Sequence, residues 1–306
     1  MGLDDHPARR RHHHRYQPRR PKNTAQPQPP GSRRRLSRGR ATLGCMRGVP
    51  LIVEPDPDDP DCATVMVDGT IAGRPYRFIL DTGAARTQVE ADGYTAALSS
   101  VAGDSSSGVF ASHAHPIVTI TNLAVGPLQA ATLEVTRAEP VQQYVRNLLG
   151  MDVLGQYCCH FRLDAGVLDL GTPPGHQPEH HLQMDSRGHF YVDVSWPGVT
   201  GHACWDSGAG ITVVNRDFWR GHPGLFEQIG SSVGTDATGA QAETPILLVA
   251  ESVIGERPFG RHKVAVVDLS HINGPLEQPI DLILGYPTLR QADWLFDFPA
   301  RQWTLM

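Results

Sequence analysis

The sequence predicts a mainly β protein made of two similar halves, and three observations support this prediction. From about residue 49 onward, short runs rich in β-branched residues are separated by Gly, Pro and Asp, as is typical of strands joined by turns. Helical periodicity is scarce over the same stretch. A short motif and a second, later motif both recur in the same order in the two parts of the chain, which indicates an internal repeat.

Eight runs are expected to form strands, and they are distributed over both halves. They are Ala63–Val67, Tyr76–Leu80, Ile117–Ile120, Leu133–Val135, Val167–Leu170, Tyr191–Val194, Ile246–Val249 and Val264–Val267. The better candidates for helices are Ala91–Leu98 and Arg216–Ile229. A Pro- and His-rich segment, residues 173–185, is expected to link a first half at residues 46–172 to a second half at residues 186–306.

Residues 1–45 have a different composition and are expected to be a disordered Arg- and Pro-rich tail. Residues 1–47 hold thirteen basic residues against two acidic ones, without apolar periodicity. Such a segment cannot bury enough apolar surface to offset the entropy lost on ordering. An Arg-rich arm could bind nucleic acid through phosphate groups. The alternative, a solvated tail without a role in the folded protein, is favoured because no interleaved aromatic residues support base stacking. We therefore expect residues 1–45 to be dispensable.

Three features predict the cellular location of the protein and its redox environment: the tail segment, the length of the apolar runs and the pattern of cysteines. Ser32–Leu36 superficially resembles a twin-arginine export signal, but no apolar region follows it. No run approaches the roughly 18 consecutive apolar residues of a membrane-spanning helix. The five cysteines are odd in number and lack a CxxC or His-spaced pattern, which argues against a disulfide framework and a zinc site. These features together predict a cytoplasmic protein.

The recurring motif is an acidic residue followed by a small hydroxyl residue, Gly and Ala. Asp81-Thr82-Gly83-Ala84 recurs 125 residues later as Asp206-Ser207-Gly208-Ala209. Leu149-Gly150 recurs 135 residues later as Leu284-Gly285, and that offset holds without a gap to Leu170 and Leu305. Because two motifs recur in the same order at near-equal spacing, the repeat is a strong signal.

The chemistry of this motif points to a pair of carboxyl groups. Each Asp follows an apolar run, so it is expected on a tight loop at the end of a buried strand, where Gly allows close approach of the backbone. Two such loops facing each other would bring Asp81 and Asp206 together. Two carboxylates about 3 Å apart cannot both ionise, so the pair shares one proton. One Asp can then act as general base toward water while the other, protonated, polarises the carbonyl under attack.

These residues resemble those of the aspartic peptidases of the pepsin and retropepsin type. From about Leu51 to Leu305 the chain resembles two retropepsin-like lobes fused in tandem, and Leu-Leu-Gly-Met-Asp at residues 148–152 is similar to the retroviral and bacterial members. The resemblance implies two closed β-barrel-like lobes of the acid-protease fold with a catalytic cleft between them. It also implies an aspartic endopeptidase acting on an extended peptide or protein substrate as a monomer, without a metal or organic cofactor.

The resemblance assigns roles to individual residues. Asp81 and Asp206 would be the catalytic pair, and Thr82 and Ser207 would brace their two loops, which Gly83 and Gly208 would shape. The substrate flap would lie in Gly103–Ala111, with Gly108, Val109 and Phe110 near the substrate, and its counterpart would be Gly234–Ala240.

Three alternatives compete with these interpretations. A peptide-binding module of the same fold without turnover is slightly favoured by the flap, which lacks the Tyr of pepsin-like flaps, and by Cys204-Trp205, where an aliphatic pair is usual. The carboxylate pair favours the enzyme. Cys204 could be a redox-sensitive thiol, although a small buried apolar residue is the commoner role. His176, His180 and His181 could bind a metal, but they lie in linker-like sequence that favours solvated side chains.

Overall fold

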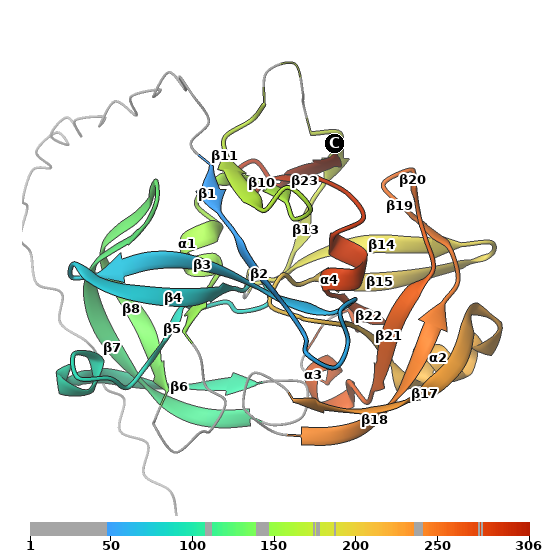
Figure 1. Ribbon diagram of the computed structural model, residues 1–306, viewed down its shortest axis with the longest axis horizontal. Helices are drawn as coiled ribbons and strands as arrows, with labels where there is room; N and C mark the ends of the chain where they lie inside the picture. The colour runs from blue at the N-terminus through green and yellow to red at the C-terminus, as the bar shows by residue number, and fades with distance from the viewer. Residues whose placement is uncertain are drawn as a thin grey trace, which may run out of the picture. The chain divides into compact units, whose positions relative to one another are not determined.

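Three β-sheets carry most of the chain in the computed structural model (Figure 1). The structure describes residues 48–107, 112–138, 147–173, 175, 178–186, 188–235, 241–274, 276 and 278–306. All eight runs predicted as strands lie within observed strands, so the mainly β prediction is confirmed. In the described part of the chain, no helix is long and apolar enough to cross a membrane.

The first half forms an eight-stranded sheet. Its order is β2 (Ile52–Pro55), β3 (Ala63–Ile71), β4 (Arg74–Leu80), β9 (Leu148–Leu149), β5 (Gln88–Glu90), β8 (Leu128–Ala138), β7 (Ser112–Val125) and β6 (Ser100–Ser107). β3 also pairs with β7, where Thr70 lies opposite Ala124. The side chains of Val67, Phe78 and Leu80 are fully buried between these strands.

The second half forms a ten-stranded sheet with the same central pairings. Its order is β17 (Phe226–Thr235), β18 (Gln241–Val249), β21 (His262–Val267), β16 (Thr212–Asn215), β22 (Leu282–Leu284), β15 (Val199–Trp205), β14 (Phe190–Trp196), β19 (Ser252–Ile254) and β20 (Arg257–Phe259), with β13 (Gln183–Met184) paired to β14. The described helices are α1 (Met151–Leu154), α2 (Arg216–Gly221), α3 (Ser270–Asn273) and α4 (Tyr286–Leu289), and 3₁₀ turns lie at Thr95–Ala97 and Pro223–Leu225.

The hairpin that precedes each motif has the same length and register in both halves. Met66 of β3 lies opposite Ile79 of β4, and 125 residues later Tyr191 of β14 lies opposite Cys204 of β15. The two turns differ in chemistry. Ala72 and Gly73 both have positive φ, as a two-residue type I′ turn requires, whereas in the second hairpin Gly198 alone has positive φ and follows Pro197. The register is therefore kept although the turn sequence is not.

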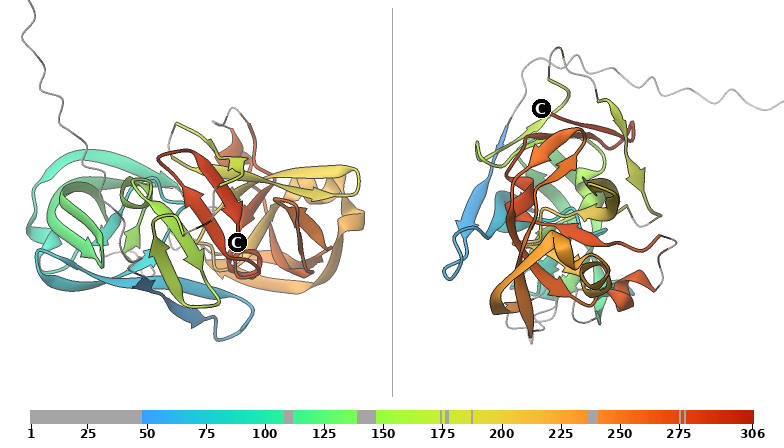
Figure 2. Two further views of the ribbon diagram at one scale, coloured as in Figure 1. Left: turned by 90° about the horizontal axis from the view of Figure 1, so that it is seen from above. Right: turned by 90° about the vertical axis from the view of Figure 1, so that its right-hand side faces the viewer.

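Strands of both halves meet in a third, six-stranded sheet, which lies between the other two sheets in Figures 1 and 2. Its order is β1 (Val49–Pro50), β11 (Val167–Leu170), β10 (Cys158–Arg162), β23 (Trp294–Asp297), β24 (Gln302–Leu305) and β12 (His180–His181). At its centre Phe161 lies opposite Trp294, and Cys159 lies opposite Phe296. Since 161 and 296, and 159 and 294, are equivalent at the offset of 135, this junction pairs equivalent strands of the two halves.

Two local predictions need correction. The helix predicted at Ala91–Leu98 is a single 3₁₀ turn at Thr95–Ala97. The helix predicted at Arg216–Ile229 ends at Gly221, and Phe226 begins strand β17. Pro223 lacks the N–H that a continuing helix would need. From Phe226 onward the backbone hydrogen bonds are made by the pairing of β17 with β18 instead.

The predicted linker, residues 173–185, also contains two short strands, β12 and β13. His180 pairs with Trp303 as Val49 pairs with Leu168, and Met184 pairs with Phe190 as Val53 pairs with Val65. The segment therefore occupies in the second half the place of β1 and β2 in the first.

Candidate active site

Asp81 and Asp206 each come directly after a central strand, at equivalent points of the two halves. Asp81 follows β4, and its N–H donates to the carbonyl of Leu149 at 3.1 Å. Asp206 follows β15, and its N–H donates to the carbonyl of Leu284 at 3.0 Å. In both cases the accepting strand is parallel to the strand that carries the aspartate. The recurring Leu-Gly pairs thus hold the two aspartate loops in place.

The glycine after each of these leucines has no space for a side chain. A Cβ on Gly150 would lie 2.7 Å from a backbone atom of Arg86, and one on Gly285 would lie 2.4 Å from the carbonyl oxygen of Ile211. The N–H of Gly150 donates to the hydroxyl of Thr87 at 3.1 Å, and that of Gly285 donates to the hydroxyl of Thr212 at 3.0 Å. Close backbone packing explains why Gly recurs here.

Different titratable residues support these two threonines. In the first half, the carboxylate of Asp152 accepts hydrogen bonds from the N–H of Thr87 at 2.9 Å and from its hydroxyl at 2.6 Å. In the second half, the hydroxyl of Thr212 lies 2.7 Å from that of Thr288, which lies 2.7 Å from Nε2 of His262. Burial raises the pKa of Asp152 and lowers the pKa of His262.

The two aspartate loops are joined by reciprocal hydrogen bonds between Thr82 and Ser207. The N–H of Ser207 donates to the hydroxyl of Thr82 at 3.0 Å, and the N–H of Thr82 donates to the hydroxyl of Ser207 at 3.2 Å. Each hydroxyl then donates to a carbonyl across the junction, that of Thr82 to Trp205 at 3.1 Å and that of Ser207 to Leu80 at 2.6 Å. Both side chains are buried, so water cannot replace these partners.

We expect Thr82→Val and Ser207→Ala each to lower the free energy of unfolding by about 1–3 kcal/mol. Each change leaves a buried N–H and a buried carbonyl of the opposite loop without a partner. Urea denaturation measures the effect, with the exposed Thr132→Val on β8 as the matched control. Equal stability of Thr82→Val and the control variant would contradict the bracing role of this residue.

The two carboxyl groups meet at the junction of the loops. Oδ1 of Asp206 accepts hydrogen bonds from the N–H of Gly208 at 2.8 Å and from the N–H of Gly83, in the opposite loop, at 3.1 Å. Oδ1 of Asp81 accepts one from the N–H of Ala84 at 2.9 Å. A Cβ on Gly83 would lie 2.5 Å from Oδ2 of Asp206, and one on Gly208 would lie 2.5 Å from Cγ of Asp81. The backbone of each glycine therefore packs directly against the carboxyl group of the other half.

The electrostatics distinguish the two aspartates. Burial, followed by the charge of Asp206, raises the pKa of Asp81 well above its ordinary value. Burial also raises the pKa of Asp206, but the N–H groups of Gly208 and Gly83 and the nearby His189 oppose the rise. The hydrogen bonds from Gly208 and Gly83 and the nearby His189 thus favour the ionised form of Asp206.

Trp205 directly precedes Asp206, and its side chain anchors the loop that carries this aspartate. Its side chain is fully buried and packs on Phe161 from the first half, with ring centroids 4.9 Å apart, and on Phe296 from the second, at 5.0 Å. Such aromatic pairs contribute about 0.5–1.5 kcal/mol each beyond the burial of area. The Trp that departs from the aliphatic pattern is therefore a strong anchor of this loop.

Two hairpins lie on the side of the molecule away from the six-stranded sheet (Figure 1). β6 pairs with β7 up to Ser107 and Ser112, and β17 pairs with β18 up to Thr235 and Gln241. The predicted flap residues Gly108, Val109 and Phe110, and most of the predicted counterpart, lie outside the described residues.

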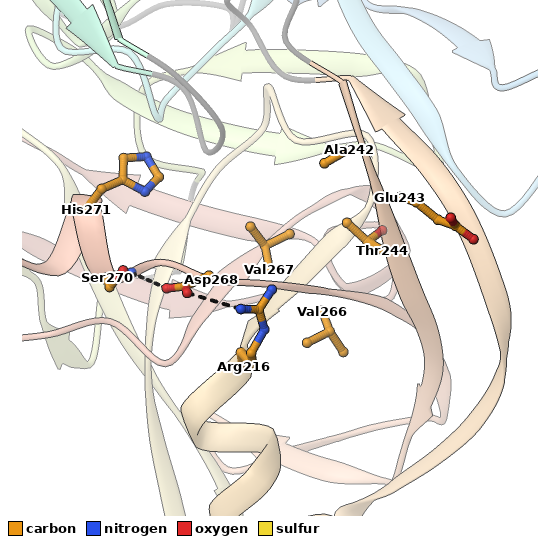
Figure 3. A pocket seen from close by; sticks show the side chains of 9 residues that line it. All are labelled: Arg216, Ala242, Glu243, Thr244, Val266, Val267, Asp268, Ser270 and His271. Atoms are coloured by element: carbon orange, nitrogen blue, oxygen red, sulfur yellow. Dashed lines mark hydrogen bonds and ion pairs between the residues drawn. The ribbon is translucent and has the colours of Figure 1, made fainter.

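A polar hollow of about 280 Å³ opens beside β18, β21 and α3 and contains neither aspartate (Figure 3). Arg216 donates to Asp268 at 3.1 Å on one side of it, and the N–H of Ser270 donates to the same carboxylate at 3.0 Å. Val267 lines the hollow and also belongs to a small apolar cluster with Cys204 and Ile283.

The other candidate residues lie apart from the carboxyl pair or lack reactive surroundings. The thiol of Cys204 is buried, and burial together with the charge of Asp206 raises its pKa, which disfavours the reactive thiolate. The four described cysteines are free thiols. His180, which lies in β12, packs against Trp303 of β24, and His176 lies outside the described residues. Within the described ranges no three His, Cys, Asp or Glu side chains are grouped to hold a metal ion.

The sequence did not indicate His189, Asp185 or His262 as parts of this region. None belongs to the recurring motifs, and their contacts arise from strands that are distant in the chain. The repeat could have pointed to the two histidines. When the two halves are aligned, His189 and His262 fall at positions where the first half has another residue type.

Comparison with known proteins places the first half near a protease family. Residues 67–156 match the family described as gag-polyprotein putative aspartyl protease. The match includes Asp81-Thr82-Gly83 and Leu149-Gly150, and it ends before the second aspartate. No curated protein matches the chain. The matched segment is therefore similar to retropepsin-like aspartyl proteases, and this similarity points to protease activity in general terms.

Proposed function

We propose that the chain is an aspartic endopeptidase in which Asp81 and Asp206 activate a water molecule between them. One observation carries this proposal: a Cβ on either motif glycine would collide with the aspartate of the other half. Two buried carboxyl groups on mutually braced loops are costly for stability, because desolvation and like charge oppose their ionisation. Such an arrangement is typical of a site built for acid–base chemistry.

We further propose that the two halves are retropepsin-like lobes fused in one chain, with domain limits near residues 46–172 and 178–306. The family match supports the first lobe only. The second lobe rests on the repeated strand registers, which extend from Met66 and Tyr191 through both aspartates to Leu170 and Leu305. The additional pairing of β3 with β7 supports a closed first lobe.

The proposed reaction follows from the position of the shared proton. Ionised Asp206 takes a proton from water as the water oxygen bonds to the carbonyl carbon of the peptide, while Asp81 donates its proton to the carbonyl oxygen. The tetrahedral intermediate then collapses as its C–N bond breaks and the leaving nitrogen receives a proton from Asp206, while Asp81 takes back a proton from a hydroxyl of the intermediate as the new carbonyl forms. The carboxyl pair returns to its single-proton state, so no cofactor is consumed.

Cleavage of a peptide library across a range of pH tests this proposal. We expect a bell-shaped dependence of activity on pH, since Asp206 must be ionised and Asp81 protonated. Both limbs should lie above the ordinary aspartate pKa of 3.8, because burial raises both values. If extended peptides bind but none is cleaved at any pH, the chain is a peptide-binding module and not an enzyme.

We expect specific activity to be independent of protein concentration. Both aspartates lie in one chain, so assembly of the pair is intramolecular and does not depend on dimer formation. Activity measured over a thousandfold dilution, together with the mass in solution, checks this. A steep loss of activity on dilution, with a mass near twice 33.4 kDa, would show that the active unit needs a second chain.

A further inference from the structure

A polar cluster of Asp185, His189 and Tyr191 lies at the turn between β13 and β14. Nδ1 of His189 lies 3.0 Å from Oδ2 of Asp185, and the N–H of His189 donates to Oδ1 at 3.0 Å. The hydroxyl of Tyr191 donates to Oδ2 of Asp185 at 2.8 Å. The Asp185 and His189 side chains are about one-fifth exposed. The imidazole is thus fixed in orientation by a partly buried carboxylate.

This cluster faces the side of the sheet on which Asp206 lies. Tyr191 is directly opposite Cys204, and Cys204 is two residues before Asp206, so these side chains point to the same face. His189 and Asp206 each lie two residues beyond this pair, so the register of the hairpin, extended past the strand ends, sets His189 opposite Asp206. His189 is also among the groups that lower the pKa of Asp206.

The first half has no imidazole at the equivalent place. Its β3–β4 hairpin matches β14–β15 in register at an offset of 125, and Thr64 and Met66 stand where the second half has His189 and Tyr191. The aspartate loops, their braces and their Leu-Gly supports all recur in both halves. His189 therefore breaks the symmetry of a site that is otherwise built twice.

We propose that His189, oriented by Asp185 and Tyr191, is a positioning residue that keeps Asp206 the ionised member of the pair and so leaves the shared proton on Asp81. A basic side chain on the Asp206 side favours the carboxylate there, and neither Thr64 nor Met66 supplies a basic side chain on the Asp81 side. The proposal rests on the proposed function for its consequence in catalysis, because it decides which aspartate acts as base.

Other titratable groups surround the cluster and enter the test. His202 of β15 stacks on Tyr191 with ring centroids 4.8 Å apart, lies 3.4 Å from Asp193, and donates its N–H to Asp281 at 2.9 Å. Cys204 and, across the junction, Asp81 also lie near Asp206. His202 is a matched control, since it is a neighbouring histidine that contacts Tyr191 and whose polar partners are Asp193 and Asp281.

The experiment compares His189→Gln, His189→Lys and His202→Gln with the unaltered protein. His189→Gln removes a group that favours the Asp206 carboxylate, so the acid limb of the activity profile should move upward by about 0.5–1 pH unit. His189→Lys keeps a positive charge and should leave the limb near its original position, and His202→Gln should leave it unchanged. Thermal melts of each variant serve as the folding control.

Carbon-13 NMR titration of the aspartate carboxyl groups gives a readout that does not need activity. The Asp206 resonance, assigned by its loss in Asp206→Asn, should titrate at higher pH in His189→Gln than in the unaltered protein. An unchanged Asp206 titration, or equal shifts in His189→Gln, His189→Lys and His202→Gln, overturns the proposal. A shifted Asp206 titration in a protein that cleaves no peptide leaves this inference standing and refutes the proposed function.

Discussion

Replacing Asp81 or Asp206 by asparagine is expected to lower peptide cleavage by about 10²- to 10⁴-fold, the range typical of general acid–base groups. Asparagine keeps the size of the side chain but cannot hold or transfer the proton. Because the two residues act as one unit, the double variant should be no less active than the single ones. Cleavage of an identified library peptide gives the rates, with Asp68→Asn, an exposed change on β3, as the matched control.

Asp81→Asn should also stabilise the fold at pH values above the raised pKa of Asp81. The folded-state pKa of Asp81 is raised well above 3.8, so the stability that this group contributes is present below its unfolded value and lost as pH rises through the folded value. Asparagine carries no charge to desolvate at any pH. We therefore expect Asp81→Asn to melt at a higher temperature than the unaltered protein above the raised pKa, and not at acidic pH. An Asp81→Asn variant that keeps substantial activity, or that melts lower than the unaltered protein at every pH, would contradict the assignment.

Adding one methyl group at Gly83 or Gly208 is expected to lower activity by about 10²-fold and to cost about 1–3 kcal/mol of stability. The new Cβ would lie 2.5 Å from the carboxyl group of the opposite half, a distance that real Cβ contacts do not reach. The loops would have to separate, and the bonds between Thr82 and Ser207 would lengthen with them. Kinetics and urea denaturation measure the two effects.

Gly93→Ala is the matched control for these variants. Gly93 is exposed in the first half, and nothing lies within 4 Å of the place that its Cβ would take. We expect it to behave like the unaltered protein. If Gly83→Ala retained full activity and stability, the two loops would have to lie farther apart than the structure shows.

The strands and the carboxyl pair were predictable because their signals are local. Val167–Leu170 is an apolar run whose limits the structure reproduces, and the two Asp-hydroxyl-Gly motifs repeat in the sequence itself. The helix predicted at Arg216–Ile229 forms only over Arg216–Gly221, because its periodicity is local, whereas strand β17 forms through pairing with β18. Propensity is overridden where tertiary hydrogen bonds compete.

The rest of the site depends on contacts that the sequence does not display. His180–His181 and Val49–Pro50 share no residue types, so the equivalence of β12 and β1 is visible only from their pairing with Trp303 and Leu168. The contact of His262 with Thr288 joins residues of β21 and α4, and that of His189 with Asp185 closes a turn in a segment predicted as linker. Polar contacts of this kind follow from packing and leave no periodic pattern.

The pairing of β10 with β23 has a consequence for how the protein unfolds and aggregates. If either half unfolded alone, the other would expose one of these strands as an open edge with unpaired N–H and carbonyl groups, a template for aggregation. It would also uncover Phe161, Trp294 and Phe296, which are fully buried in the intact sheet. A molecule with one half unfolded is therefore disfavoured both by the open strand edge and by the exposed aromatic side chains. Unfolding should then be a single cooperative transition. A protein with the proposed activity benefits from this, since a partly open chain is a substrate for its own intact neighbours.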